Sequence, residues 1–279
     1  MELLIRGELR SFAEPVVMGV LNCTPDSFSD GGRYATVDTG LRRAQQMVDQ
    51  GAQIIDVGGE SSRPGAEPVS ASEELERVVP IIEAIAQTSD VVISVDSTKP
   101  AVMRAACQAG AGLINDINAL REEHAVEAAL ACGAAVCLMH MQGQPRNMQV
   151  QPHYADVVTQ VSEFLVDRTN ACVAAGMDRR SLLLDPGFGF GKSLHHNLQL
   201  LAGIRRVVDL GLPVLVGLSR KSMFEKLLGL GVDERGPAGL SAALWAATHG
   251  VSVIRTHDVA ETVQAMAVLN AIHNVGGDA

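Results

Sequence analysis

Eight short apolar runs, each followed by a stretch with helical periodicity, constrain the fold of this chain more than any other feature of its sequence. The runs are rich in Val, Ile and Leu and begin near positions 16, 54, 91, 112, 134, 182, 213 and 252, about 34 residues apart on average. Continuous apolar strands that alternate with helices are typical of a parallel sheet whose faces are covered by helices. Eight such units favour a closed (β/α)₈ TIM barrel, in the α/β class, over an open doubly wound sheet.

A chain of 279 residues has room for two domains of ordinary size, but the eight repeats favour one domain over residues 1–279. Residues 1–14 form an extension in front of the first run. Within it, Leu3 to Leu9 predicts a small β-hairpin that turns near Gly7 and Glu8 and covers the lower end of the barrel. Helices are expected over 39–51, 72–87, 100–110, 154–176 and 259–274.

Charge and composition argue against several classes of function. The 32 acidic side chains outnumber the 22 basic ones, for a net charge of −10, and the basic residues are scattered, which disfavours a nucleic-acid-binding role. The longest apolar stretch, 128–139, is too short to span a membrane, and no secretory signal precedes it, so we expect a cytoplasmic protein without membrane contact. The five cysteines lack CxxC spacing and are expected to be reduced and mostly buried.

Nearly every apolar run ends in a polar residue, and in a barrel these ends meet on the face where catalytic groups collect. Asp96, Asn115 and Asp185 follow three of the runs. A carboxylate accepts two parallel hydrogen bonds from an N–C–NH₂ edge, and Asn both donates and accepts, so an aminated heterocycle is a plausible ligand. Two alternatives stay open: a metal site, disfavoured by the absence of a His pair, and structural roles with Asp96 as a helix cap and Asp185 in a turn.

A second group of side chains is suited to an anion. Arg255 and His257 lie two apart on the last run, so their side chains are expected on the same side, just before the last helix. The corresponding end of such barrels often holds phosphate, and Lys221 adds a cation nearby. Salt bridges or helix caps are the structural alternative. The Gly-Lys-Ser at 191–193 does not complete a nucleotide-binding phosphate loop, because Pro186 stands where the first Gly is needed.

Two loops, 22–32 and 58–65, combine Gly with polar residues, a composition that suits either a lid over a substrate or ordinary surface turns. Together with the strand ends, they carry motifs that resemble those of the dihydropteroate synthases over almost the whole chain. The motifs are Asn22-x-Thr24-Pro25-Asp26-Ser27-Phe28-x-Asp30-Gly31-Gly32, Asp56-x-Gly58-Gly59-Glu60-Ser61-x-Arg63-Pro64-Gly65, Ser94-Val95-Asp96-Ser97, Asn115-Asp116, Asp185-Pro186-Gly187-x-Gly189-Phe190-Gly191-Lys192, Ser219-Arg220-Lys221-Ser222 and Arg255-x-His257-Asp258.

The resemblance implies that 6-hydroxymethyl-7,8-dihydropterin pyrophosphate is joined to 4-aminobenzoate, giving 7,8-dihydropteroate and pyrophosphate in folate biosynthesis. This alkyl transfer develops positive charge on the pterin methylene, which carboxylates such as Asp30 and Asp96 stabilise while cations hold the leaving group. No protein nucleophile is required, and Cys23 has no Ser–His or Cys–His arrangement around it. The resemblance also implies a homodimer and a target of sulfonamides. The helix expected over 237–250, with the sole Trp245, is suited to a partner surface.

The resemblance assigns roles to individual residues as follows. Implied catalytic residues are Asp30, Asp96 and Lys221; pterin contacts are Asp96, Asn115, Met139, Asp185, Phe190, Gly217 and Lys221; pyrophosphate contacts are Asn22, Arg63, Arg255 and His257; aminobenzoate contacts are Phe28, Ser62, Arg63, Pro64, Lys221 and Ser222. A Mg²⁺ ion is implied near Asn22 and Asp30, in keeping with the preference of this hard cation for oxygen ligands and substrate phosphates.

One position departs from the family pattern. Residue 62 is Ser where most members have Thr, so the hydroxyl is kept and the methyl lost, and we expect activity to be retained. Two other readings of the motifs remain. A methyltransferase domain that binds methyltetrahydrofolate shares the barrel but lacks the two loop motifs. A non-catalytic pterin-binding paralogue would use the same pocket without turnover.

Overall fold

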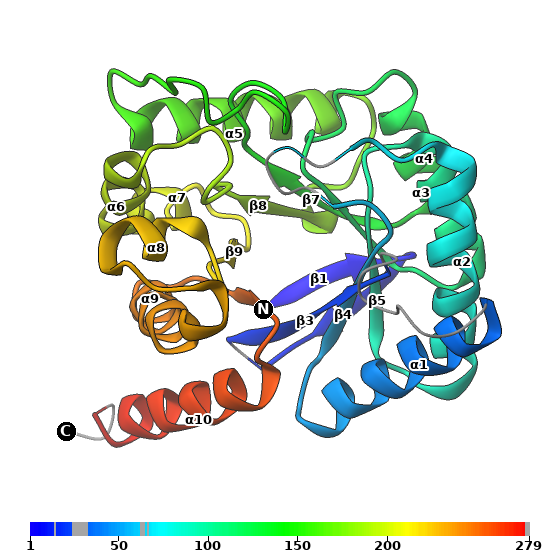
Figure 1. Cartoon of the computed structure of the whole chain (residues 1–279). Coiled ribbons are helices and arrows are strands. Elements are labelled where there is room, and N and C mark those ends of the chain that lie inside the picture. The colour runs from blue at the N-terminus through cyan, green and yellow to red at the C-terminus, as the bar shows by residue number, and fades with distance from the viewer. Residues whose placement is uncertain (14, 24–32, 62–64, 66, 277–279) are drawn as a thin grey trace.

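The computed structural model describes residues 1–13, 15–23, 33–61, 65 and 67–276, with the backbone alone for 33–36. At its centre is a sheet of parallel strands in the order β8-β7-β6-β5-β4-β3-β10-β9 (Figure 1). Each strand begins within two residues of a predicted apolar run. Their bounds are β3 (Val16–Asn22), β4 (Ile54–Gly58), β5 (Val92–Asp96), β6 (Leu113–Asp116), β7 (Ala135–Met139), β8 (Leu182–Asp185), β9 (Leu215–Gly217) and β10 (Val253–Thr256).

The sheet curls into a barrel, as predicted. The last strand, β10, pairs in parallel with the first, β3, in a register that sets Arg255 beside Met18. Between β8 and β9 the pairing is reduced to one bridge, between Leu184 and Val214, and the Leu184 N–H donates to the Pro213 carbonyl at 2.9 Å. Because all eight strands run in parallel, their carboxyl ends lie on one face of the barrel.

Helices surround the barrel (Figure 1). They are α1 (Arg33–Asp49), α2 (Ala71–Thr88), α3 (Pro100–Ala109), α4 (Ala125–Cys132), α5 (Val157–Ala174), α6 (Leu194–Ala202), α7 (Ile204–Val208), α8 (Ser222–Leu228), α9 (Gly236–Thr248) and α10 (Val259–Gly276), with short 3₁₀ turns η2 (Arg179–Ser181) and η3 (Val232–Glu234). Two helix starts differ from the prediction by more than two residues. Helix α1 begins at Arg33, ahead of position 39, and α5 begins at Val157 because the Asp156 carboxylate accepts from the Val158 and Thr159 amides.

The predicted N-terminal hairpin is present as β1 (Glu2–Ile5) and β2 (Glu8–Ser11), paired antiparallel. Its turn lies at Arg6 and Gly7, one residue before the expected position. Leu3 and Ile5 are buried and pack against barrel residues such as Val16 and Met18 at the amino-terminal ends of the strands. The hairpin therefore closes the lower end of the barrel with apolar side chains and leaves the opposite end for the site.

Two further expectations concern the cysteines and the membrane. All five cysteines are free thiols, and four of them are buried, with Cys132 half-buried, which confirms the prediction. Within the part of the chain that the structure describes, none of the helices combines the length and apolar character needed to cross a bilayer.

Candidate active site

Arg255 is the centre of the polar groups at the carboxyl ends of the strands. Its Nε donates to Asp56 Oδ2 at 2.6 Å, and its Nη2 donates to Asp96 Oδ2 at 2.9 Å. The three residues come from β10, β4 and β5, so one guanidinium joins strands from distant parts of the chain. Burial raises the pKa of Asp96 to about 7, against the opposing influence of Arg255. The pKa of Arg255 is raised well above its usual range because the attraction of Asp56 and Asp96 outweighs its burial, so it stays charged.

Asp56 is a site residue that the sequence analysis did not assign. Its side chain is fully buried in the middle of β4, and its Oδ2 also accepts from Asn115 Nδ2 at 3.1 Å. The other oxygen, Oδ1, is buried without a hydrogen-bond partner among the described residues. The sequence does contain an indication that Asp56 belongs to the site, because this residue interrupts an apolar strand and begins one of the quoted motifs. Asp56 therefore fixes Asn115 and Arg255 relative to each other.

Asp185 ends β8 beside these groups. Its Oδ1 accepts from the Gly187 amide at 2.7 Å, so the structural alternative of a turn at 185–187 is present together with the buried carboxylate. Burial raises the pKa of Asp185, while the Gly187 amide, Lys221, Lys192 and Arg255 act in the opposite direction. The alternative role for Asp96 is wrong, because the N-cap residue of α3 is Lys99.

Lys221 and Phe190 form one wall of the site. The Lys221 Nζ lies 4.4 Å from the centre of the Phe190 ring, a cation–π contact. Burial lowers the pKa of Lys221 to about 8, and the charge of Asp185 opposes this shift. Phe190 packs in a small apolar cluster with Met139, Met141 and Met148. Carboxylates, an amide, a cation and an apolar wall thus converge on the space above the barrel.

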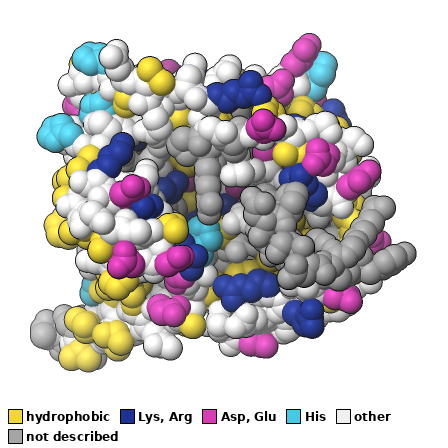
Figure 2. All heavy atoms as spheres, viewed as in Figure 1, with side chains coloured by type: hydrophobic (Ala, Val, Ile, Leu, Met, Phe, Trp, Pro, Cys, Tyr) yellow, Lys and Arg dark blue, Asp and Glu magenta, His cyan; other side chains and the backbone are white. Residues whose placement is uncertain are grey.

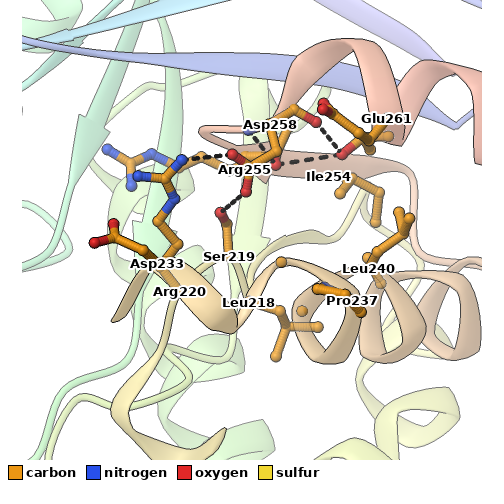
Figure 3. Close-up of a pocket in the computed structure, with 15 residues that line it drawn as sticks. Leu218, Ser219, Arg220, Asp233, Pro237, Leu240, Ile254, Arg255, Asp258 and Glu261 are labelled. Atoms are coloured by element: carbon orange, nitrogen blue, oxygen red, sulfur yellow. Dashed lines mark hydrogen bonds and ion pairs between the residues drawn. The ribbon is translucent and has the colours of Figure 1, made fainter. Parts of the chain in front are cut away.

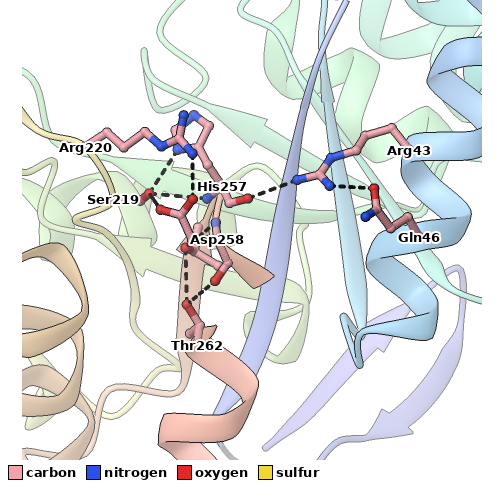
Figure 4. A network of polar contacts seen from close by, with 8 residues as sticks. Arg43, Gln46, Ser219, Arg220, His257, Asp258 and Thr262 are labelled. Carbon is pink, nitrogen blue, oxygen red and sulfur yellow. Dashed lines mark hydrogen bonds and ion pairs between the residues drawn. The ribbon is translucent and has the colours of Figure 1, made fainter. Parts of the chain in front are cut away.

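Beyond β10, His257 belongs to a separate network (Figure 4). Its Nδ1 is 3.0 Å from Ser219 Oγ, and its carbonyl accepts from Arg43 of α1 at 3.2 Å. Arg220 Nη2 donates to Asp258 Oδ1 at 2.6 Å. Arg255 and His257 were predicted to lie on one strand with their side chains on the same side. His257 lies outside that strand, because β10 ends at Thr256. Arg255 points to the carboxylates, whereas His257 contacts Ser219, two residues after β9.

A cavity of about 380 Å³ lies next to this network, between α9 and the start of α10 (Figure 3). Leu240 and Pro237 line it from α9, and Arg255 and Asp258 line it from the other side. Asp56, Asn115 and Asp185 do not line this cavity. Lys, Arg and His side chains are visible near the middle of the molecular face in Figure 2.

The remaining predicted site residues fall into two groups. Asn22 ends β3 opposite Gly58 and is half-buried, Gly217 ends β9, and Ser222 begins α8 on the surface. The assignments that lie outside the described residues are Phe28, Asp30, Ser62, Arg63 and Pro64. No group of three or more His, Cys, Asp or Glu side chains suited to a metal ion occurs in the described ranges. Asn22 could offer one oxygen to a cation whose other ligands come from a substrate.

The fold and the site together define a (β/α)₈ barrel protein that gathers carboxylates, an amide and cations at the carboxyl ends of its strands. Residues 18–257 match the family model described as pterin binding enzyme. The dihydropteroate synthase of Escherichia coli (strain K12) is 51% identical over 271 residues, 97% of this chain and 96% of that protein. This chain belongs to the dihydropteroate synthases.

Solved structures agree with this assignment. The Yersinia pestis dihydropteroate synthase with a sulfonamide drug complex has a TM-score of 0.93 and 51% identity, covering 98% of this chain and all of that one. The Xanthomonas albilineans enzyme in complex with 7,8-dihydropteroate has a TM-score of 0.88 and 45% identity, covering 98% of this chain and 99% of that one. The predicted family and barrel are thereby confirmed.

Proposed function

We propose that this chain joins 6-hydroxymethyl-7,8-dihydropterin pyrophosphate to 4-aminobenzoate, giving 7,8-dihydropteroate and pyrophosphate. The observation that carries the proposal is the pair of bonds from Arg255 to Asp56 and Asp96. These bonds place a cation suited to the leaving group next to carboxylates that can accept hydrogen bonds from a heterocycle. Relatives of this fold bind the second substrate and the product, since Xanthomonas albilineans structures carry 4-aminobenzoic acid and 7,8-dihydropteroate.

Asp185 and Asn115 hold the amino edge of the pterin in this proposal. A carboxylate has about four acceptor positions, and the Gly187 amide uses one of those of Asp185. Asn115 is already oriented by Asp56, so its amide needs no rearrangement on binding. The apolar wall of Phe190 and Met139 suits one face of the ring, Gly217 leaves room beside it, and Lys221 lies along it.

Bond cleavage is eased from both sides of the pterin methylene. Positive charge grows on this carbon as its bond to pyrophosphate lengthens, and Asp96 and Asp30 stabilise it. Arg255, His257, Asn22 and Arg63 hold the pyrophosphate. A guanidinium carries five N–H donors, and Asp56 and Asp96 engage two of the three nitrogens of Arg255, so donors remain for a phosphate oxygen. The amine of 4-aminobenzoate attacks the methylene carbon as pyrophosphate leaves with the bonding electrons of the C–O bond, and the new secondary amine then loses one proton to pyrophosphate or solvent.

The aminobenzoate site is proposed to combine Lys221 and Ser222, at the junction of β9 and α8, with Phe28, Ser62, Arg63 and Pro64. Sulfonamides would compete there. A Mg²⁺ ion held by Asn22, and by oxygens of the pyrophosphate, would neutralise charge on the leaving group. The single amide oxygen of Asn22 fits this arrangement, since Mg²⁺ usually takes few protein ligands and completes its coordination with waters and substrate phosphates.

We further propose that residues 1–279 act as one cytoplasmic domain that forms a homodimer. Exposed apolar side chains on α10, at Val268, Ile272 and Val275, follow helical spacing and form a stripe. Trp245 of α9 is 49% exposed as well. Apolar surface of this kind is typical of subunit interfaces. Light scattering should give twice the chain mass at micromolar concentration, and Val268→Asp with Ile272→Asp should give a monomer; a monomeric wild type contradicts the dimer.

Product formation tests the proposed reaction. The purified chain is incubated with the pterin pyrophosphate, 4-aminobenzoate and Mg²⁺, and 7,8-dihydropteroate and pyrophosphate are measured, with omission of each component as the control. We expect equal amounts of the two products. Binding of the pterin pyrophosphate without product supports the non-catalytic paralogue instead. Binding of methyltetrahydrofolate, without turnover of the pyrophosphate, supports the methyltransferase alternative.

A further inference from the structure

Lys192 is a buried cation beside the site that the reaction above does not use. Its side chain is 1% exposed, between the turn after β8 and the start of α6. No ion pair of Lys192 with a carboxylate is found within the described part of the chain. A buried ammonium is unfavourable unless its donors are satisfied, and burial lowers the pKa of Lys192 to about 7. The reason for keeping a lysine here must lie in its hydrogen bonds.

The ammonium has three acceptors within 3.0 Å, and a fourth, the His140 carbonyl oxygen, lies 3.4 Å away. Its Nζ is 2.8 Å from the Gly187 carbonyl, 3.0 Å from the Phe190 carbonyl and 3.0 Å from His140 Nδ1. An ammonium cannot accept, so His140 Nδ1 accepts and the ring is neutral. Burial and the charge of Lys192 lower the pKa of His140 to about 2, in agreement with a neutral ring. The ammonium therefore ties the 187–190 turn to the residue after β7.

The backbone of this turn lies so close to the loop after β7 that two of its glycines have no room for a Cβ. Gly187 has a φ of +68°, and a Cβ there would lie 1.9 Å from the His140 carbonyl oxygen. Gly191 has a φ of +62°, and a Cβ there would lie 2.3 Å from the Gln142 carbonyl oxygen. The turn thus packs directly on the loop after β7. In this conformation its Gly187 and Phe190 carbonyl groups point at Lys192.

Both ends of the turn reach groups assigned to the pterin. At one end, the Gly187 amide donates to Asp185 Oδ1 at 2.7 Å. At the other end, the Phe190 ring lies against Lys221. The charge of Lys192 also favours the ionised form of Asp185. Loss of the ammonium would leave the Phe190 carbonyl without this donor and the Gly187 carbonyl with the Phe190 amide alone, at 3.1 Å, and would release the turn that orients Asp185.

We propose that Lys192 is a positioning residue of the pterin site, whose ammonium holds the 187–190 turn in the conformation that presents Asp185 to the heterocycle. The inference rests on the proposed function, because it takes the pterin as the ligand of Asp185. Lys192 does not touch the substrate. It acts through Asp185, and this route distinguishes it from a residue that only supports the fold.

A double-mutant cycle tests this route. Lys192→Met, Asp185→Asn and the double variant are compared with wild type in steady-state kinetics and in calorimetric binding of the pterin pyrophosphate without aminobenzoate. We expect Lys192→Met to raise KM and Kd for the pterin substrate by about 10- to 100-fold, the range for loss of charge-assisted hydrogen bonds, with kcat changed less than about threefold. In the Asp185→Asn background the same substitution should change Kd by less than about threefold. Lys226→Met, on the exposed face of α8, is the matched control and should behave as wild type.

The outcomes separate the two claims. Equal effects of Lys192→Met with and without Asp185 overturn the positioning role, as does an unchanged Kd. Circular dichroism checks folding, and if Lys192→Met is unfolded, Lys192→Gln, which keeps two donors, takes its place with a smaller rise in Kd expected. A wild type that binds the pterin pyrophosphate but makes no dihydropteroate overturns the proposed function, while the binding cycle still tests Lys192.

Discussion

Asp56→Asn removes the charge from the residue that holds Arg255 and Asn115, and it should destabilise the folded protein. Asp56 is fully buried and accepts from Arg255 at 2.6 Å and from Asn115 at 3.1 Å through one oxygen. The substituted amide keeps the shape and one acceptor oxygen, but its NH₂ group adds donors beside Arg255 and the charge attraction is lost. Breaking a buried ion pair from one side costs about 3–5 kcal/mol, and the amide retains part of the bonding, so we expect a loss of about 2–3 kcal/mol.

Thermal unfolding followed by circular dichroism measures this loss. For a chain of this size about 1 kcal/mol corresponds to 2–4 °C, so the Tm of Asp56→Asn should fall by roughly 4–12 °C. Asp209→Asn is the matched control, because its carboxylate pairs with Arg205 at 2.8 Å on the surface, and we expect no measurable change in Tm. A Tm of Asp56→Asn within about 1 °C of wild type would refute the reasoning, since the buried bridge would then contribute no stability.

Three further results follow from the same contacts. Asp185→Ala should lower kcat/KM for the pterin pyrophosphate by about 30- to 1,000-fold, equivalent to about 2–4 kcal/mol, and unchanged steady-state kinetics would remove Asp185 from the site. Arg255→Lys keeps the charge but loses the fork that reaches Asp56 and Asp96. In calorimetry, this substitution should weaken the binding of the pterin pyrophosphate more than the binding of a pterin without phosphate. Equal losses of affinity for the two ligands contradict this. Burial lowers the pKa of Lys221 from 10.5 in the unfolded chain to about 8, so the unfolded chain binds more protons between these values, and wild type should gain stability relative to Lys221→Met from pH 8 to 10. A relative loss of stability over that range, in chemical unfolding, contradicts the shift.

The fold could be predicted from the sequence because its signal is repeated and local. Eight apolar strands alternate with helices, and a strand such as Val16–Asn22 is buried along nearly its whole length, so composition and period alone identify it. The hairpin was recognisable because the short apolar run from Leu3 to Ile5 is followed by Gly7, where the chain can turn back. The start of α1 was placed too late, because apolar spacing does not mark the first turn at Arg33.

The partners of the site residues could not be predicted, because they depend on the curvature of the barrel. Arg255 and Asp96 were assigned to two different substrate groups, yet they are 2.9 Å apart. Asp56 is 199 positions from Arg255 in the chain, and no local pattern pairs them. Lys192 was visible only as part of a motif, since its role depends on carbonyl groups that point inward through the backbone of the turn.

A crystal structure with the pterin pyrophosphate bound is the most direct test of the central claim, that one site combines acceptors for the heterocycle with cations for the leaving group. We expect the amino edge of the pterin within hydrogen-bond distance of Asp185 and Asn115, and the pyrophosphate against Arg255 and His257. A pterin bound away from Asp185, or a pyrophosphate that leaves both Arg255 and His257 without contact, would contradict the account.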